Sequence, residues 1–244
     1  LSALLAALLE ERDIFRGDCA FTDCDLRHRL NELIHQAKNK RYQPFFIQAK
    51  KHLQKINWLA ETNFLTLPIE LTGVLLALAY PERVAKQRMQ YGHFLAENGK
   101  GLIINEQDAL ASEAFIVAAN LSEYQQKLQV RLAAPVDIEQ LITWKIISVK
   151  QVNQLNYDPK TQRISAKQRE VHGAIVLSEK PSNEKISPGA LVHLWQQQIE
   201  RYGLAYLNWR DEDKKLLSRW RWINQTQQHL NFPIVDESTL LEKL

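Results

Sequence analysis

The spacing of apolar residues changes twice along this 244-residue chain. Over residues 1–80, apolar side chains recur every three or four positions, which is the period of a helix with a buried face. Residues 1–12 are apolar on most faces, which favours a helix packed on several sides. The helices predicted in this part cover residues 1–12, 23–38, 43–58 and 68–80.

After residue 80 the spacing becomes that of strands. The pair Asn98-Gly99 lies between two β-prone runs and is a strong signal for a hairpin, because both residues of the favoured turn need a positive φ. Residues 126–132 alternate strictly between apolar and polar, as in a strand with one buried face. The elements predicted here are a hairpin over 91–104, strands over 114–120 and 126–132, and a helix that opens at Pro135 and runs through Trp144.

The last part of the chain combines both periods. Two long alternating runs, 146–157 and 162–177, flank Asp158-Pro159-Lys160-Thr161, which is typical of a type I turn and predicts a long antiparallel pair. Helical spacing returns at Pro188. The helices predicted beyond it cover 188–203 and 211–228, and another begins near Asp236. The order of helices, strands and helices indicates an α+β protein.

Composition is that of an ordinary globular protein, with 45% hydrophobic residues. The formal net charge of +3 permits a polyanionic partner without demanding one. Two cysteines, Cys19 and Cys24, are too few for a disulfide framework. The longest apolar run, near 74–80, is far shorter than the roughly 20 residues that span a bilayer. We therefore expect a cytoplasmic protein. Since both ends lie in helix-forming stretches, we also expect it to be a piece of a longer one.

Common catalytic motifs are missing from the sequence: it has no GxxxxGK[ST] phosphate loop, no HExxH and no GxSxG. The one constellation of metal-ligand type is Cys19, Cys24 and His28, with His35 further along the same predicted helix. Its spacing is looser than that of a CxxC zinc knuckle, and no second pair closes the site. We expect these side chains to be structural and predict no metal.

Aromatic and basic residues leave two interpretations open. Trp209 and the segment Arg219–Trp222 have the composition of a base-stacking surface. The alternative, which we favour, is a buried helix face made by Leu216, Leu217, Trp220 and Ile223. Each basic cluster could be a solvated face or a nucleic-acid contact. The clusters are Lys38/Lys40/Arg41, Lys50/Lys51/Lys55, Arg83/Lys86/Arg88 and Lys167/Arg169.

The order of motifs from residue 75 onward resembles the part of DEAH/RHA-type helicases that leaves a helical bundle and enters an oligonucleotide-binding (OB) fold. An apolar helix is followed by ERVAKQR (82–88), which resembles the basic "NVARR"-like segment of that family. A Tyr-led hairpin, an apolar strand and RLAAPVDIEQL (131–141) then follow in the expected order.

A closer resemblance is to bacterial HrpB-type ATP-dependent RNA helicases. Five segments match motifs of that family in collinear order. They are LAALLEERD (5–13), YPERVAKQR (80–88), NYDPKTQRISAKQREVHGAIVLSEKP (156–181), GLAYLNW (203–209) and FPIVDESTLL (232–241). Three positions depart from the family pattern, because Tyr157 and Phe232 replace tryptophans and Val235 replaces a serine.

This resemblance implies the C-terminal accessory region of such a helicase without its motor domains. The phosphate loop and the DEAH box would precede Leu1, so we expect no ATPase or other catalytic activity from this chain. ATP and Mg²⁺ would be cofactors of the motor domains alone. The implied domains are a helical bundle segment over 1–88, an OB-like β-barrel over 89–144 and an α+β helicase-associated domain over 145–244.

The implied function is to contact the RNA backbone and the RecA-like motor domains, so we expect single-stranded RNA and those domains as partners. The residues expected to contact RNA are Arg83, Lys86, Arg88, Lys100, Lys40 and Arg41. An alternative stays open, in which the region is a structural module that packs on the motor domains without touching RNA.

Overall fold

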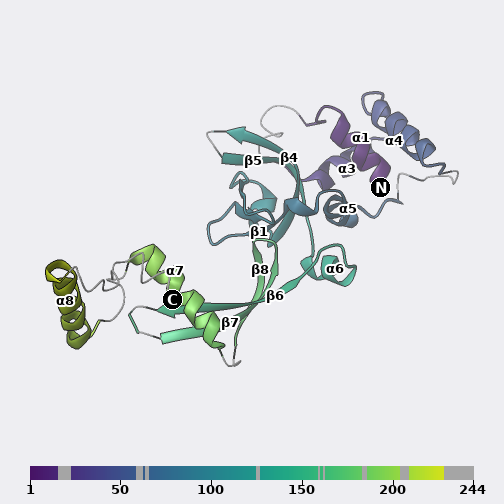
Figure 1. Cartoon of the computed structure of the whole chain (residues 1–244). Coiled ribbons are helices and arrows are strands. Elements are labelled where there is room, and N and C mark those ends of the chain that lie inside the picture. The colour runs from purple at the N-terminus through teal and green to yellow at the C-terminus, as the bar shows by residue number, and fades with distance from the viewer. Residues whose placement is uncertain are drawn as a thin grey trace. The chain divides into compact units, whose positions relative to one another are not determined.

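The computed structural model describes residues 1–15, 23–58, 63, 66–124, 127–158, 160–161, 163–182, 186–203 and 209–227 (Figure 1). Its contacts divide the chain into two compact units. Unit 1 comprises Leu1–Gln151 and Glu170–Ser178, and unit 2 comprises Val152–Arg169 and Glu179–Leu244. The helical segment and the barrel therefore share one unit, while the three-domain division drawn from the sequence stays a prediction.

Unit 1 begins with helices, as the apolar spacing predicts. They are α1 (Ser2–Glu10), α3 (Leu26–His35), α4 (Gln43–Lys55) and α5 (Thr72–Ala79), with short 3₁₀ turns η2 (Ile69–Leu71) and η3 (Pro81–Arg83). Helix α3 begins after Asp25, whose carboxylate accepts a hydrogen bond from the Arg27 amide and so caps the helix. Pro81 stops α5, since the residue before a proline is disfavoured in a helix.

A closed five-stranded barrel follows the helices. Its strands are β1 (Val84–Gln87), β2 (His93–Ala96), β3 (Gly101–Ile103), β4 (Phe115–Tyr124) and β5 (Lys127–Pro135). They close in the order β1-β2-β3-β5-β4, and only the β3–β5 pair is parallel. The expectation of an OB-like barrel is confirmed. However, β1 lies within residues 1–88, the range predicted from the sequence to be the helical bundle segment.

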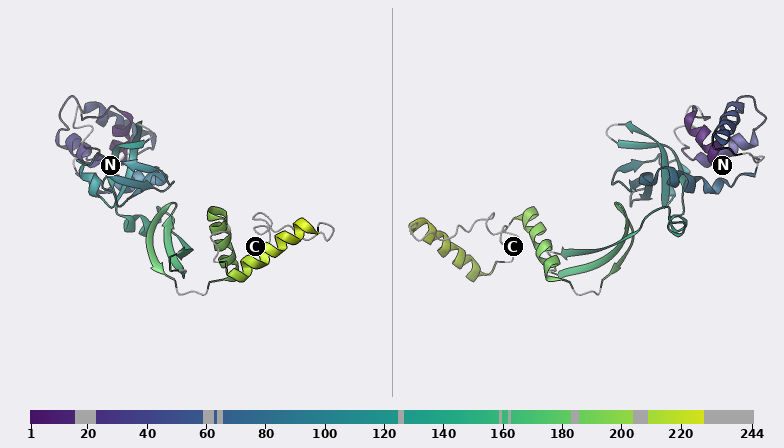
Figure 2. Two further views of the ribbon diagram at one scale, coloured as in Figure 1. Left: turned by 90° about the vertical axis from the view of Figure 1, so that its left-hand side faces the viewer. Right: turned by 45° about the vertical axis from the view of Figure 1, so that its right-hand side comes forward.

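Alternation along the strands gives the barrel two apolar faces. One set of side chains, including Phe94, Leu102 and Ile116, fills the interior. Neighbouring residues of β1, β4 and β5 point outward and join the core of the helical layer, as Val84, Val117 and Leu132 do. The purple and blue helices accordingly lie against the teal barrel in both views of Figure 2. Because the helices cover the side formed by β1, β4 and β5, the β2–β3 side is left for other contacts.

The β2–β3 hairpin forms where Asn98-Gly99 predicts it. Gly99 has a φ of 82°, and its amide donates to the Ala96 carbonyl at 2.9 Å. Asn98 does not share the positive φ. The turn is therefore the type in which a single glycine takes the left-handed conformation, and not the two-residue turn expected from the sequence.

Beyond the barrel, α6 (Ile138–Thr143) is followed by a sheet of three strands in the order β6-β7-β8. These are β6 (Lys150–Asp158), β7 (Arg163–His172) and β8 (Ile175–Pro181). The sequence predicted a single strand over 162–177, and this is wrong. Gly173, with a φ of 53°, breaks the run into two strands joined by a two-residue turn.

Two helices of unit 2 complete the described part: α7 (Pro188–Tyr202) and α8 (Asp211–Thr226). Helix α7 buries Leu194 and Ile199, but α8 buries none of its residues. The expectation of a buried α8 face is therefore wrong: Leu216 is 60% exposed, and Leu217, Trp220 and Ile223 are only partly buried. The helix predicted near Asp236 lies outside the described residues. No helix in the described part is long and apolar enough to cross a membrane.

Candidate nucleic-acid interface

A small cleft opens where the end of β1 meets β2 and the β7–β8 hairpin, all within unit 1. Its volume is about 200 Å³. Its lining comprises Lys86, Gln87, Arg88, Leu95, Ala174, Ile175 and Val176. Two of these side chains are cationic, so the cleft brings together part of the basic segment that the sequence singled out.

The β7–β8 hairpin is fastened to the barrel by three kinds of contact. The Ala174 amide donates to the Glu97 carbonyl at 2.8 Å, beside the β2–β3 turn. The Lys86 ammonium donates to the Val176 carbonyl at 2.6 Å. Ile175 is fully buried in the shared core. The wall of the cleft is therefore held in place from both the backbone and the core.

The loop between β1 and β2 continues this surface outward. Its backbone is tied down, since the Arg88 amide donates to the His93 carbonyl at 2.8 Å and the Ile104 amide donates to the Gly92 carbonyl at 2.9 Å. Its side chains project outward: Met89 is fully exposed and Tyr91 is 48% exposed. A fixed loop that presents a cation, a thioether and an aromatic ring fits a base-stacking platform beside a phosphate contact.

The predicted RNA-contacting residues differ in how available they are. Arg88 and Lys100 are exposed, and the turn that carries Lys100 abuts the β7–β8 hairpin. Lys86 is partly buried, and its ammonium group is hydrogen-bonded to the Val176 carbonyl. Arg83 donates to the Ala119 carbonyl at 2.7 Å and lies over the Tyr80 ring, so it ties η3 to β4. Arg88 and Lys100 are thus the more available pair.

Lys40 and Arg41 lie elsewhere, between α3 and α4 in the helical layer. Both are exposed, but the Arg41 guanidinium donates to the Ile14 carbonyl at 2.7 Å and lies 5.3 Å from the Tyr42 ring centre. No described contact joins this pair to the cleft. Their role in RNA binding stays a prediction.

Sequence reasoning missed Met89 and Tyr91 as candidate contacts. Tyr91 was placed in the first strand of the predicted hairpin over 91–104, and Met89 was assigned to no element. The available signal was Gly92, which has a φ of 70° and ends the loop before β2. A glycine at that point separates the loop side chains from the strand that follows.

A larger open groove in unit 1 has the opposite charge. It measures about 590 Å³ and runs beside α5, α6 and the start of β4. Its ionisable lining residues are Arg27, Glu70, Glu113 and Asp137. Three carboxylates against one guanidinium would repel a phosphate backbone, so this groove does not suit RNA.

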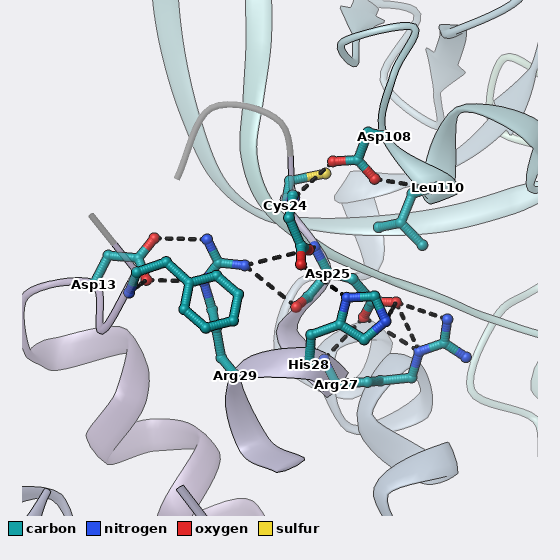
Figure 3. Close-up of polar contacts among 10 residues, drawn as sticks. Asp13, Cys24, Asp25, Arg27, His28, Arg29, Asp108 and Leu110 are labelled. Carbon is teal, nitrogen blue, oxygen red and sulfur yellow. Dashed lines mark hydrogen bonds and ion pairs between the residues drawn. The ribbon is translucent and has the colours of Figure 1, made fainter. Parts of the chain in front are cut away.

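Two of the residues considered as metal ligands, Cys24 and His28, belong to a polar network at the helix–barrel junction (Figure 3). Cys24 is buried, and its amide donates to the Asp108 carboxylate at 2.6 Å. Burial also raises the pKa of its thiol, which keeps it protonated. The His28 ring lies 2.9 Å from the Asp23 carboxylate, and His35 is exposed. Among the described residues no cluster of three or more His, Cys, Asp or Glu could hold a metal, while Cys19 lies outside them.

The same network locks α3 onto the barrel. Arg29 is fully buried and pairs with Asp13 at 2.7 Å, with the Phe15 ring 4.5 Å away. Asp25 is equally buried and pairs with Arg27 at 2.7 Å. The Ala133 amide of β5 donates to the Cys24 carbonyl at 2.8 Å. The buried Arg29 and Asp25 are paired within the network and have a structural role, while their partners Asp13 and Arg27 stay partly exposed.

Comparison with known proteins agrees with this architecture. The ATP-dependent RNA helicase HrpB of Escherichia coli (strain K12) is 28% identical over 176 residues, which covers 71% of this chain and 22% of that protein. The crystal structure of the E. coli DExH-box NTPase HrpB matches 98% of this chain at a TM-score of 0.58 and 24% identity. A structure of the Escherichia coli DEAH/RHA helicase HrpB gives a TM-score of 0.57 at 23% identity.

The resemblance to HrpB-type helicases is therefore confirmed, and the fold is that of a part of those structures. This chain covers only 28% of each solved chain. No protein-family model matches it.

Proposed function

We propose that this chain is an accessory region of an ATP-dependent RNA helicase and that its barrel contacts the RNA backbone at the cleft and the β1–β2 loop. The observation that carries the proposal is the position of Arg88, Met89 and Tyr91. They lie in the first loop of an OB-like barrel, on exposed side chains held by a fixed backbone. Loops at this position are where OB folds bind oligonucleotides.

The physical role of such a surface is to follow a strand without selecting its sequence. Arg88 and Lys100 would neutralise phosphates and release counterions, which makes binding depend on salt. Tyr91 would stack on a base, a contact that tolerates any sequence because every base has a π-face. Non-specific contact of this kind suits a helicase, whose RNA must move past the surface.

Catalysis would belong to the rest of the parent protein. ATP and Mg²⁺ would bind RecA-like motor domains, against which this region would pack. This chain by itself would not hydrolyse ATP.

The testing experiment measures binding of a fluorescein-labelled single-stranded oligouridylate to the full chain by anisotropy across a range of salt concentrations. Replacing both Arg88 and Lys100 by alanine should weaken binding and lower the salt slope by about 1.4, since each lost phosphate contact on a single strand contributes about 0.7. Tyr91→Ala should weaken binding by about 1–3 kcal/mol without changing the slope.

A matched control removes two other exposed cations, Lys50 and Lys51, from α4. This K50A/K51A variant should keep the wild-type slope. Equal slopes for all the variants would contradict the proposed contact.

A protein-docking role is the second candidate, favoured by an apolar groove of about 340 Å³ between α1 and α5. Leu5, Leu9 and Leu75 line it. Absence of RNA binding by the chain, together with tight binding to motor domains supplied separately, would support this role instead.

A further inference from the structure

The β6–β8 sheet has two faces of different character, and its contacts tell them apart. On one face the Arg169 guanidinium contacts the side chains of Gln154 on β6 and Glu179 on β8. On the other face the Tyr157 ring lies 4.7 Å from that of Trp195, so α7 packs there. Because side chains alternate along a strand, these contacts assign the neighbouring residues as well.

The face that carries Arg169 is made mostly of charged and hydrogen-bonding side chains. We call it the polar sheet face. Its polar members in unit 2 are Gln154, Asn156, Asp158, Arg163, Ser165, Lys167, Arg169 and Glu179, and its apolar members are Val152 and Pro181. Gln154, Asn156, Arg163 and Ser165 are exposed, and the Lys167 and Arg169 side chains keep 42% and 29% of their accessible area.

We propose that the polar sheet face binds the backbone of single-stranded RNA. Three cations share this face with two carboxylates, Glu179 and Asp158, and the Asp158 carboxylate is held in the turn by the Lys160 amide and the Thr161 hydroxyl. All three cations lie on the single strand β7 at every second or fourth residue. Such a row can pair with successive phosphates along an extended strand. Gln154, Asn156 and Ser165 add neutral donors of the kind that contact phosphate and sugar oxygens. The proposal takes RNA as the ligand from the proposed function but concerns a separate set of residues.

The composition of the face favours a nucleic acid over an acidic protein. Protein–protein interfaces are built around apolar and aromatic anchors. Among the described residues of the polar sheet face none is aromatic, and its apolar members are Val152 on β6 and Pro181 at the end of β8. Interfaces with nucleic acids are instead polar and positively charged.

Glu179 limits the positive charge of the face in the free protein. Its carboxylate bonds both Lys167 and Arg169, each at 2.5 Å. Hydrogen bonds from Lys167, and then from Arg169, lower the pKa of Glu179, so it stays ionised near neutral pH. An incoming phosphate must compete with this carboxylate for the two cations. Removing its charge should therefore improve RNA binding.

The test uses the full chain and the labelled oligouridylate, with binding measured by anisotropy at near-physiological salt. Glu179→Gln should bind about three- to tenfold more tightly, because it frees two cations without changing the shape of the side chain. Replacing both Arg163 and Arg169 by glutamine should weaken binding by about tenfold. Loss of the folded face would lower the affinity and not raise it, so a gain for Glu179→Gln supports the inference even where the double variant is unstable.

The variants and a polyglutamate competitor separate the failure of this inference from the failure of the proposed function. If R88A/K100A weakens binding while Glu179→Gln and the R163Q/R169Q variant both leave it unchanged, this inference is overturned and the proposed function stands. If the chain binds no RNA, both this inference and the proposed function fail. Displacement of the RNA by polyglutamate at equal charge concentration would assign the face to an acidic protein surface and overturn the inference as well.

Discussion

Gly173, at the tip of the β7–β8 hairpin, illustrates how one residue determines whether the cleft forms. Its φ is 53°, and a Cβ at this position would lie 2.5 Å from the Glu97 carbonyl oxygen. A main-chain oxygen has no freedom to swing away, unlike the end of a side chain. Any larger residue would therefore strain the backbone and push the hairpin off the barrel.

Gly173→Ala should accordingly lower the free energy of unfolding by about 2 kcal/mol, measured by urea titration with circular dichroism. Gly189→Ala is the matched control. Gly189 lies in the first turn of α7, with open space around its Cα, so alanine there should be neutral or stabilising by up to about 0.5 kcal/mol. Equal effects of the two substitutions would contradict the strained docking of the hairpin.

The sequence does not predict which cations of the basic segment Arg83–Arg88 are exposed. The sequence presents Arg83, Lys86 and Arg88 as equivalent cations. Arg83 donates a hydrogen bond to the Ala119 carbonyl of β4, and Lys86 donates one to the Val176 carbonyl of the β7–β8 hairpin. Both partners are distant in sequence, so no local pattern could have separated these two residues from the exposed Arg88.

At the scale of elements, strong local signals predicted structure well. The Asn98-Gly99 hairpin and the helix from Pro188 to Gly203 lie where the sequence places them. Strand β1 was missed because it has only four residues, among them Lys86, and is completed by pairing with β2 and β4. The break between β7 and β8 depends on one glycine in an otherwise continuous alternating run.

Helix α8 shows how an amphipathic pattern can mislead. Its apolar residues have helical spacing, yet it buries none of them, because the described part of the chain offers no core at this place. An exposed Trp222 beside Arg219 and Arg221 keeps open the base-stacking interpretation of this segment.

Two leucines of unit 2 test this exposure with the same chemical change. Leu194 in α7 is 6% exposed and Leu216 in α8 is 60% exposed. Leu194→Ala should cost about 2–4 kcal/mol of unfolding free energy, and Leu216→Ala at most about 0.5 kcal/mol. A large loss for Leu216→Ala, measured by the same urea titration, would mean that α8 is packed after all.

At the scale of the whole molecule, the helices and the barrel are one packing unit, not two. Outward-facing residues of β1, β4 and β5 are shared with the helical core, and the hydrogen bonds of the Cys24 backbone with Asp108 and Ala133 cross the junction. Periodicity predicts each layer but carries no information on which face of the barrel is covered. That choice leaves the β1–β2 loop exposed, which the proposed RNA contact requires.

The most direct test of the account is to cross-link the full chain to single-stranded oligouridylate with ultraviolet light and to identify the attached peptides by mass spectrometry. We expect cross-links at residues 88–92, where Met89 and Tyr91 are exposed in the β1–β2 loop. They should disappear when Tyr91 is replaced by alanine together with R88A/K100A. Cross-links confined to the helices α3 and α4, or none from a chain that binds the RNA, would contradict the assignment of the barrel as the RNA-contacting surface.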